Sequence, residues 1–160
     1  MKSATKLSLL TVPAIVAIGF LMGQLSNSGF GNGWFDQLDK PAAMPPGWVF
    51  GAAWTFLYIL LGIAVALAVA ASRSPARRTA LILFILQLVL NYSWSPLFFG
   101  LHLAEVALVV ILAILALSIA TALVLRRVSP AAALLMVPYL AWLCFASYLN
   151  FEIIALNPGV

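Results

Sequence analysis

The residues of this chain that could contribute chemistry are amides, hydroxyls and indole rings within long apolar stretches. Gln87, Asn91 and Ser95 follow one another at steps of four, so on a helix they share one face. Trp94 lies three residues after Asn91, next to that face. A flat apolar molecule suits such a face, because its rings stack on aromatic side chains while an amide fixes its orientation.

Aromatic residues at helical spacing recur in two other stretches. Trp54 and Tyr58 are four apart in the first of them. In the second, steps of three and four relate Trp142, Phe145, Ala146 and Leu149. These rings and the amide face could enclose a binding cavity. Equally, the amides could hydrogen-bond one helix to another while the rings fill a core. Spacing alone leaves both interpretations open.

The residue types needed for catalysis or metal binding are sparse. The chain has one histidine, His102, and one cysteine, Cys144. A single cysteine excludes an internal disulfide and a CxxC motif. No carboxylate lies deep within an apolar stretch, where a proton relay would need one. The glycine-rich run at 29–33 lacks the Lys-Ser/Thr of a phosphate-binding loop. We therefore expect no catalytic residue, no metal site and no required cofactor.

The elements that must position these side chains are membrane-spanning helices. Hydrophobic residues make up 65% of the chain and charged residues 8%, whereas a soluble domain carries about 25% charged residues. The charges leave five uncharged stretches at 7–35, 41–72, 79–104, 106–125 and 128–151. One crossing of the hydrocarbon core takes about 20 helical residues, so each stretch holds one span.

We predict an all-α membrane protein, a five-transmembrane-helix bundle forming one domain over residues 1–160. The helices are expected near 7–25, 48–71, 79–100, 103–126 and 130–156. The links between the last four helices are short, so those helices should be antiparallel neighbours. Lys2 and Lys6 before an apolar run could also begin a signal peptide. Because no Ala-x-Ala site follows at 22–26, we expect the first helix to be retained.

The first loop, 26–46, is unusually long and contains Trp34, Phe35 and Leu38. Loops of this length within a compact domain are usually functional or disordered. The apolar side chains could fold over one mouth of the bundle as a lid. They could also rest at the lipid headgroups, as interfacial aromatic residues do. The sequence leaves both possibilities open.

The basic residues predict the orientation in the membrane. Seven of the eight lie on the side of the N-terminus, and only Lys40 lies on the other side with the acidic residues. The positive-inside rule makes the basic side cytoplasmic, with the first loop and C-terminus outside. The clustered arginines therefore give no support for nucleic-acid binding. The membrane is expected to be a bacterial cell membrane.

Three segments carry specific motifs: WFDQLDKPAAMPPGWVFGAAWTFLY at 34–58, QLVLNYSWSPLFF at 87–99 and LLMVPYLAWLCFASYLN at 134–150. They contain the patterns KP-x-x-x-PP, N-x-x-WSP and PYL-x-W. In motif and order the chain resembles the TspO/MBR family, the tryptophan-rich sensory proteins whose animal members are the translocator or peripheral benzodiazepine receptor proteins. The resemblance covers nearly the whole sequence.

The resemblance implies a five-helix bundle, commonly a homodimer, with a ligand cavity under the first loop. Small residues at steps of three and four, such as those from Gly62 to Ala70, permit but do not require a dimer. Family members bind porphyrins and related tetrapyrroles, cholesterol in some cases, and isoquinoline-carboxamide or benzodiazepine drugs. The matching cavity positions are Trp54, Asn91, Trp94, Trp142, Phe145, Ala146 and Leu149, beside Tyr58. The matching lid residues are Trp34, Ala43, Pro45 and Pro46.

Two departures from the family pattern affect the ligand. Ala43 stands where the family usually has an aromatic residue, which should widen the cavity or weaken porphyrin stacking. In the last helix, Phe151 and Ala155 replace the Tyr and the basic residue of the cholesterol motif. We therefore expect no high-affinity cholesterol site at this position.

The function expected from the sequence is that of an integral membrane receptor or sensor for a planar apolar ligand, a porphyrin or other tetrapyrrole. The site would lie between the first loop and the second, third and fifth helices. Two alternatives are light- and oxygen-dependent degradation of porphyrin, and transport of a tetrapyrrole or lipid. An ordinary enzyme is disfavoured, because no acid–base pair lies near the cavity positions.

Overall fold

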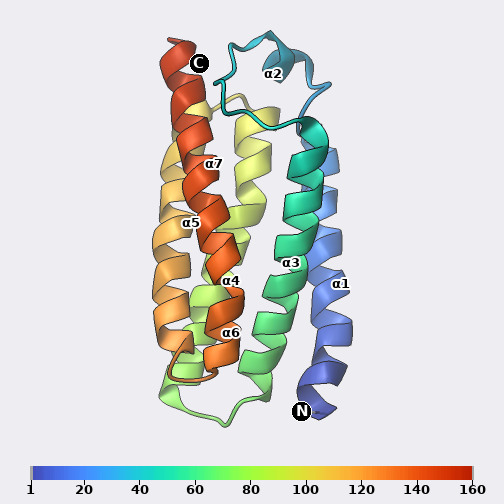
Figure 1. The fold of residues 1–160 in the computed structure, drawn as a ribbon, viewed down its shortest axis with the longest axis vertical. Coiled ribbons are helices and arrows are strands. Elements are labelled where there is room, and N and C mark those ends of the chain that lie inside the picture. Colours follow the sequence, from blue (N-terminus) through green and yellow to red (C-terminus); the bar gives the residue numbers. More distant parts are fainter. Residues whose placement is uncertain (1, 160) are drawn as a thin grey trace.

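The computed structural model describes residues 2–159, with only the backbone of Lys2. Its helices are α1 (Lys2–Leu25), α2 (Gly33–Gln37), α3 (Gly47–Ala70), α4 (Pro75–Ser95), the π-helix η1 (Pro96–Gly100), α5 (Ala104–Leu125), α6 (Pro130–Leu135) and α7 (Val137–Leu156) (Figure 1). Within the described residues, five spans are long and apolar enough to cross a membrane, with η1 extending α4 and α6 preceding α7. The predicted all-α, five-helix membrane fold is confirmed.

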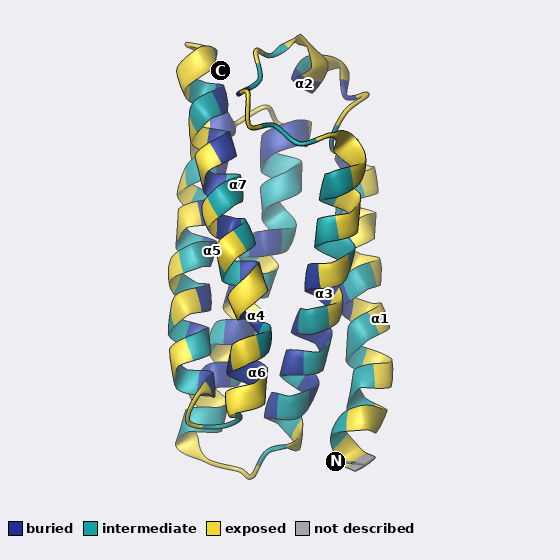
Figure 2. Ribbon diagram, in the orientation of Figure 1, coloured by how far each residue is buried: buried dark blue, intermediate teal, exposed yellow. Residues whose placement is uncertain are grey.

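The spans form one elongated bundle with the two termini at opposite ends (Figure 1). α1 packs along α3, α3 packs on α6, and α5 packs on both α4 and α7. The link between α3 and α4 and the link between α5 and α6 lie at the end of the N-terminus, and α2 crosses the other end. Exposed residues cover the outer faces of the helices, as expected of surfaces that meet lipid (Figure 2).

Serine caps fix the start of two spans. Ser74 accepts a hydrogen bond from the backbone N–H of Arg77, and Ser129 accepts one from Ala132. Each serine precedes a proline, whose missing N–H costs nothing in the first helical turn. The side chain of Arg77 then donates to the carbonyls of Ala68 and Val69 at the end of α3, at 3.1 and 2.7 Å. These contacts hold the α3–α4 link in a tight turn.

Two prolines interrupt spans that the sequence predicted as continuous helices. Pro96 lacks a backbone N–H, and the helix widens there into η1, where the Leu101 N–H bonds to the Pro96 carbonyl at 2.9 Å. Pro138 similarly follows a break at Met136 between α6 and α7. Capping also makes α4 begin at Pro75 rather than near residue 79. The WSP motif therefore ends α4 and sets the course of the Phe98 and Phe99 backbone.

The crossing of α1 and α3 depends on two glycines. A Cβ atom on Gly62 would lie 2.6 Å from the Val12 Cα atom, and a Cβ atom on Gly19 would lie 2.2 Å from the Tyr58 ring. The Thr11 hydroxyl donates to the Gly62 carbonyl across the same contact, at 2.7 Å. Close backbone approach of this kind is how small residues stabilise helix pairs in membranes. It also places α1 against the side of α3 that carries Tyr58.

Replacing Gly62 with alanine should destabilise the bundle, because the new methyl group meets the backbone of α1 rather than a movable side chain. Overpacking of this kind costs about 1–3 kcal/mol. Gly51→Ala on the same helix is the control, since nothing lies within 4 Å of a Cβ atom there. Thermal unfolding in detergent, followed by circular dichroism, should show a lower midpoint for Gly62→Ala alone. Equal midpoints for the two variants would contradict the close crossing.

Candidate functional site

A cavity of about 410 Å³ lies beneath the first loop. α1, α3, α4 and α7 surround it, and Ile111 and Ile114 of α5 close its back. The volume falls within the range of about 300–1,000 Å³ that is typical of small-molecule sites. Gln24 and Ser28 border the cavity and are exposed, so it reaches the surface near the loop.

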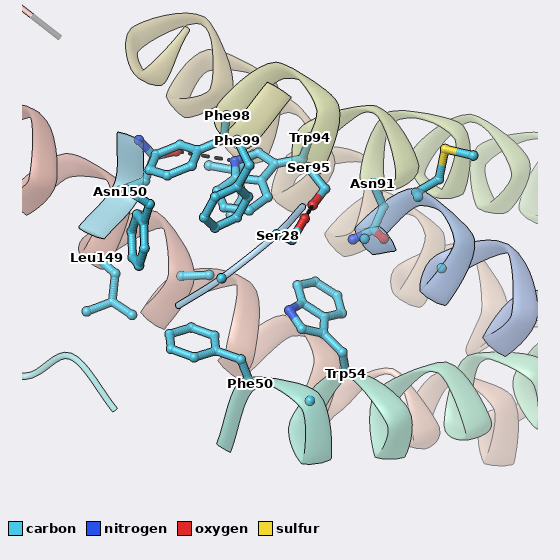
Figure 3. A pocket seen from close by; sticks show the side chains of 18 of the residues that line it. Ser28, Phe50, Trp54, Asn91, Trp94, Ser95, Phe98, Phe99, Leu149 and Asn150 are labelled. Carbon is cyan, nitrogen blue, oxygen red and sulfur yellow. Dashed lines mark hydrogen bonds between the residues drawn. The ribbon is translucent and has the colours of Figure 1, made fainter. Parts of the chain in front are cut away.

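Aromatic rings form two facing walls of the cavity. Trp54 and Phe50 project from α3, and Trp94, Phe98 and Phe99 project from α4 and η1 on the opposite side (Figure 3). The rings of Trp94 and Phe98 are stacked, with centroids 4.9 Å apart and planes 15° apart. Two ring-lined walls facing each other suit a flat ligand, since both of its faces can be covered.

Asn91 forms the polar floor of the cavity. Its Oδ1 atom accepts a hydrogen bond from the Tyr58 hydroxyl at 2.9 Å, and its Nδ2 atom donates to the Tyr139 oxygen at 3.1 Å. The Tyr139 hydroxyl donates in turn to Gln87 Oε1 at 2.8 Å, and the Ser118 hydroxyl donates to the same atom at 3.2 Å. The network joins α3, α4, α5 and α7, so the amide is held rigidly beneath the rings.

A second polar contact fixes the indole of Trp94. Its Nε1 atom donates to Asn150 Oδ1 at 3.2 Å, and Asn150 Nδ2 donates to the Ala104 carbonyl at 3.0 Å. Asn150 is buried and lines the cavity. The chain of hydrogen bonds therefore holds the Trp94 ring in one orientation between α4, α7 and the start of α5.

The first loop is attached to the bundle at several points. Asn32 accepts hydrogen bonds from the N–H groups of Trp34 and Phe35, which begin α2, and its Nδ2 atom donates to the Phe99 carbonyl at 3.3 Å. Ser28 and Ser95 share a hydrogen bond near the cavity (Figure 3). At the other end of the loop, the Asn157 side chain pairs with the Asp39 backbone through two bonds of 2.9 Å.

Aromatic packing and one lysine complete the attachment of the loop. Phe35 is buried against Phe98 and Phe99, and Trp34 stacks on the His102 ring with centroids 4.4 Å apart. The Lys40 ammonium donates to three carbonyl groups at and after the end of α2. The loop therefore covers this end of the bundle as a packed roof.

The glycine-rich run at 29–33 belongs to this roof. Gly29 and Gly31 have φ angles of +100° and +95°, which favour glycine. The Gly31 N–H donates to both carboxylate oxygens of Asp36, at 3.2 and 3.0 Å. Turn geometry therefore accounts for these glycines.

The lining of the cavity is uncharged. Of the residues described between 2 and 159, no Asp, Glu, Lys or Arg lines it. An ionised group enclosed here would lose its hydration without gaining a partner charge, which is costly. The cavity therefore suits a neutral ligand, or a neutral part of a larger one.

Comparison with known proteins shows the family of this chain. The sequence profile of the TspO/MBR family matches residues 11–156. The chain belongs to the TspO/MBR family. Tryptophan-rich protein TspO of Chlorobaculum tepidum is 38% identical over 150 residues, which cover 93% of this chain and 94% of the relative. The protein of the same name from Archaeoglobus fulgidus is 40% identical over 150 residues, covering 92% and 94%. The translocator protein of Homo sapiens is 36% identical over 145 residues, covering 89% and 86%.

Six of the residues predicted for the TspO/MBR cavity line it in the structure. They are Trp54, Tyr58, Asn91, Trp94, Ala146 and Leu149. Trp142 and Phe145 do not line the cavity. Trp142 packs edge-on against Trp54, with centroids 6.4 Å apart, and Phe145 packs on Trp142 at 5.7 Å. The buried indole N–H of Trp142 has no acceptor among residues 2–159. These two residues thus form a second layer behind the wall.

The predicted lid residues also lie outside the cavity lining. Trp34 packs on His102 and Phe98 at the far side of the loop, and Ala43, Pro45 and Pro46 are half-buried or exposed. Met44 lines the cavity next to Ala43 instead. Because Ala43 is exposed and does not line the cavity, its small side chain does not set the cavity width in this structure.

The contribution of the first helix was missed by sequence reasoning, which placed the cavity between the loop and three later spans. Gly19, Phe20 and Gly23 of α1 line it. Two glycines four residues apart were the available signal, since they mark a face that a neighbour or ligand can approach closely. Phe50 was missed as well. It lies four residues before Trp54 and extends the aromatic stripe on α3.

Removing the Asn32 side chain should loosen the roof without unfolding the bundle. Asn32→Ala loses the cap of α2 and the bond to Phe99, together about 1–3 kcal/mol of local stability. Hydrogen exchange of the amides of residues 33–37 should then become faster. Gln37→Ala, which removes one exposed bond within α2, is the control. Unchanged exchange in Asn32→Ala would show that other contacts hold the roof.

Proposed function

We propose that this TspO/MBR protein is a membrane receptor that binds a planar, mostly apolar ligand, with a porphyrin or related tetrapyrrole as the class. The observation that carries the proposal is the uncharged cavity with two facing aromatic walls above a fixed amide. Relatives that include a "Tryptophan-rich sensory protein" of Cereibacter sphaeroides and translocator proteins of animals support a receptor or transport role. An isoquinoline-carboxamide-like drug would suit the same walls.

The apolar ring and the charged propionates of a porphyrin would occupy different parts of the cavity. Its flat ring would lie between Trp54 and Trp94, where both faces can be covered. Its propionate carboxylates would stay at the exposed edge near Gln24 and Ser28, where water can solvate them. The ligand would then be held mainly by apolar contact, and the Asn91 amide would contribute its orientation.

A single tryptophan substitution tests the location of the site. Trp54→Ala removes a wall, and burial of such a ring is worth about 2 kcal/mol, or roughly thirtyfold in affinity. Trp48→Ala is the matched control, because Trp48 lies on the same helix, is 75% exposed and does not line the cavity. Titration with protoporphyrin IX, followed by tryptophan quenching, should show weaker binding only for Trp54→Ala. Wild-type affinity in that variant would refute the proposed site.

Esterified porphyrin tests the position of the carboxylates. Protoporphyrin IX dimethyl ester should bind at least as tightly as the free acid. Esterification removes the carboxylate charges, and no cationic side chain lines the cavity that could have paired with them. Both ligands should lose affinity in Trp54→Ala. A large loss of affinity on esterification, of about tenfold or more, would mean that a cationic side chain outside the cavity holds the carboxylates. The comparison is made in uncharged detergent at constant pH.

Other parts of the proposal concern the membrane setting. We propose that the arginine-rich end faces the cytoplasm of a bacterial cell. Phe151 and Ala155 are exposed on α7, and a tight cholesterol site is not expected there. The homodimer, light-dependent porphyrin degradation and transport remain predictions from the family resemblance.

A further inference from the structure

A surface groove lies at the opposite end of the bundle from the first loop, at the start of α4. The residues that line a groove there are Arg73, Ser74, Arg77, Arg78, Leu81 and Ile82, followed by Ile85 one turn further along the helix. The part of this groove at the start of α4 is basic, and the part further along the helix is apolar. The groove is separate from the cavity, with which it shares no residue.

The arginines of the groove have different roles. Arg77 is occupied, because its guanidinium donates to the Ala68 and Val69 carbonyls. Arg73 and Arg78 are exposed, and within the described part of the chain their side chains have no hydrogen-bond or ion-pair partner. The four acidic residues of the chain belong to the first loop, the start of α5 and the end of α7, at the other end of the bundle. Among residues 2–159, no acidic side chain therefore neutralises these two charges.

The apolar side of the groove runs from the arginines toward the middle of the membrane. Ile82 and Ile85 are 48% and 58% exposed. From Arg78 to Ile85, α4 rises about 10 Å, since each helical residue adds about 1.5 Å. An anionic headgroup at the arginines would thus have an apolar surface for its acyl chains along the next two turns of α4.

We propose that this groove binds an anionic phospholipid, with the phosphate at Arg73 and Arg78 and an acyl chain along Ile82 and Ile85. Guanidinium groups bind phosphate oxygens through paired, charge-assisted hydrogen bonds. These bonds are weaker with a zwitterionic lipid, because the cation of its own headgroup competes with the guanidinium for the phosphate. The bound lipid would brace the α3–α4 link, which Arg77 already holds. The proposal does not depend on a ligand in the cavity.

Arg126 and Arg127 provide a matched control for this proposal. They carry the same charge at the same end of the bundle, are exposed and do not line the groove. If basic residues merely attract anionic lipids in general, the loss of either arginine pair should weaken lipid binding equally. A lipid site should respond only to the loss of Arg73 and Arg78.

The experiment titrates the purified full chain in neutral detergent with phosphatidylglycerol or phosphatidylcholine, and native mass spectrometry gives the affinity of the first bound lipid. In the wild type, phosphatidylglycerol should bind roughly thirtyfold tighter, since each of the two basic residues near the headgroup favours an anionic lipid by about fivefold. Arg73→Gln with Arg78→Gln should remove that preference, whereas Arg126→Gln with Arg127→Gln should keep it. Equal loss in both double variants, or no preference in the wild type, would overturn the site.

A second variant keeps the test decisive if the arginine variant does not fold. Ile82→Trp leaves every charge in place and fills the apolar part of the groove, so phosphatidylglycerol should bind several-fold more weakly. Ile119→Trp, at an exposed position of α5, should bind it normally. Unchanged affinity in Ile82→Trp would overturn the acyl-chain surface. Displacement of the lipid by millimolar inorganic phosphate would also overturn it, because the arginines would then bind the anion alone.

Discussion

The structure depends on the requirement that Asn91 and the tyrosines around it, which lie at membrane depth, be hydrogen-bonded within the protein. Asn91 meets this requirement with two hydrogen bonds that bring Tyr58 of α3 and Tyr139 of α7 to α4. Gln87 extends the network to Ser118 of α5. Below the network, toward the N-terminal end, apolar side chains fill the bundle. Above it the helices leave the cavity open, so the buried amide marks the boundary between the core and the cavity.

The two ends of the cavity are built by different interactions. Its floor is the hydrogen-bonded network, whereas its roof is a loop held by the Asn32 cap, by aromatic packing of Phe35 and by the Asn157–Asp39 pair. Breaking one contact of the roof leaves the others intact, so the roof can move in part. Loss of Asn91 would instead leave the buried Tyr58 hydroxyl without a partner and would remove one of the two side-chain bonds of the Tyr139 hydroxyl, which is costly. Loss of a single roof contact is therefore expected to disturb the bundle less than loss of Asn91.

The sequence predicted the five spans because charge spacing reports directly on the thickness of the hydrocarbon core. The family resemblance, rather than spacing alone, gave Trp54, Asn91 and Trp94 as cavity positions, and these three residues line the cavity. The sequence could not predict which face looks inward. For that reason Trp142 was expected in the wall but lies behind it, and Gly23 of α1 was overlooked. Such details depend on how α1 and α3 cross, and only packing between distant segments decides that.

The measurement that tests the account most directly follows the five tryptophan indole N–H signals by NMR during addition of a porphyrin ester. Trp54 and Trp94 line the cavity, so the account predicts that their signals shift most at the lowest ligand concentration. Trp48 faces outward, and its signal should not shift until excess ligand enters the detergent. A Trp48 shift that leads the titration, with Trp54 and Trp94 unmoved, would contradict binding above Asn91.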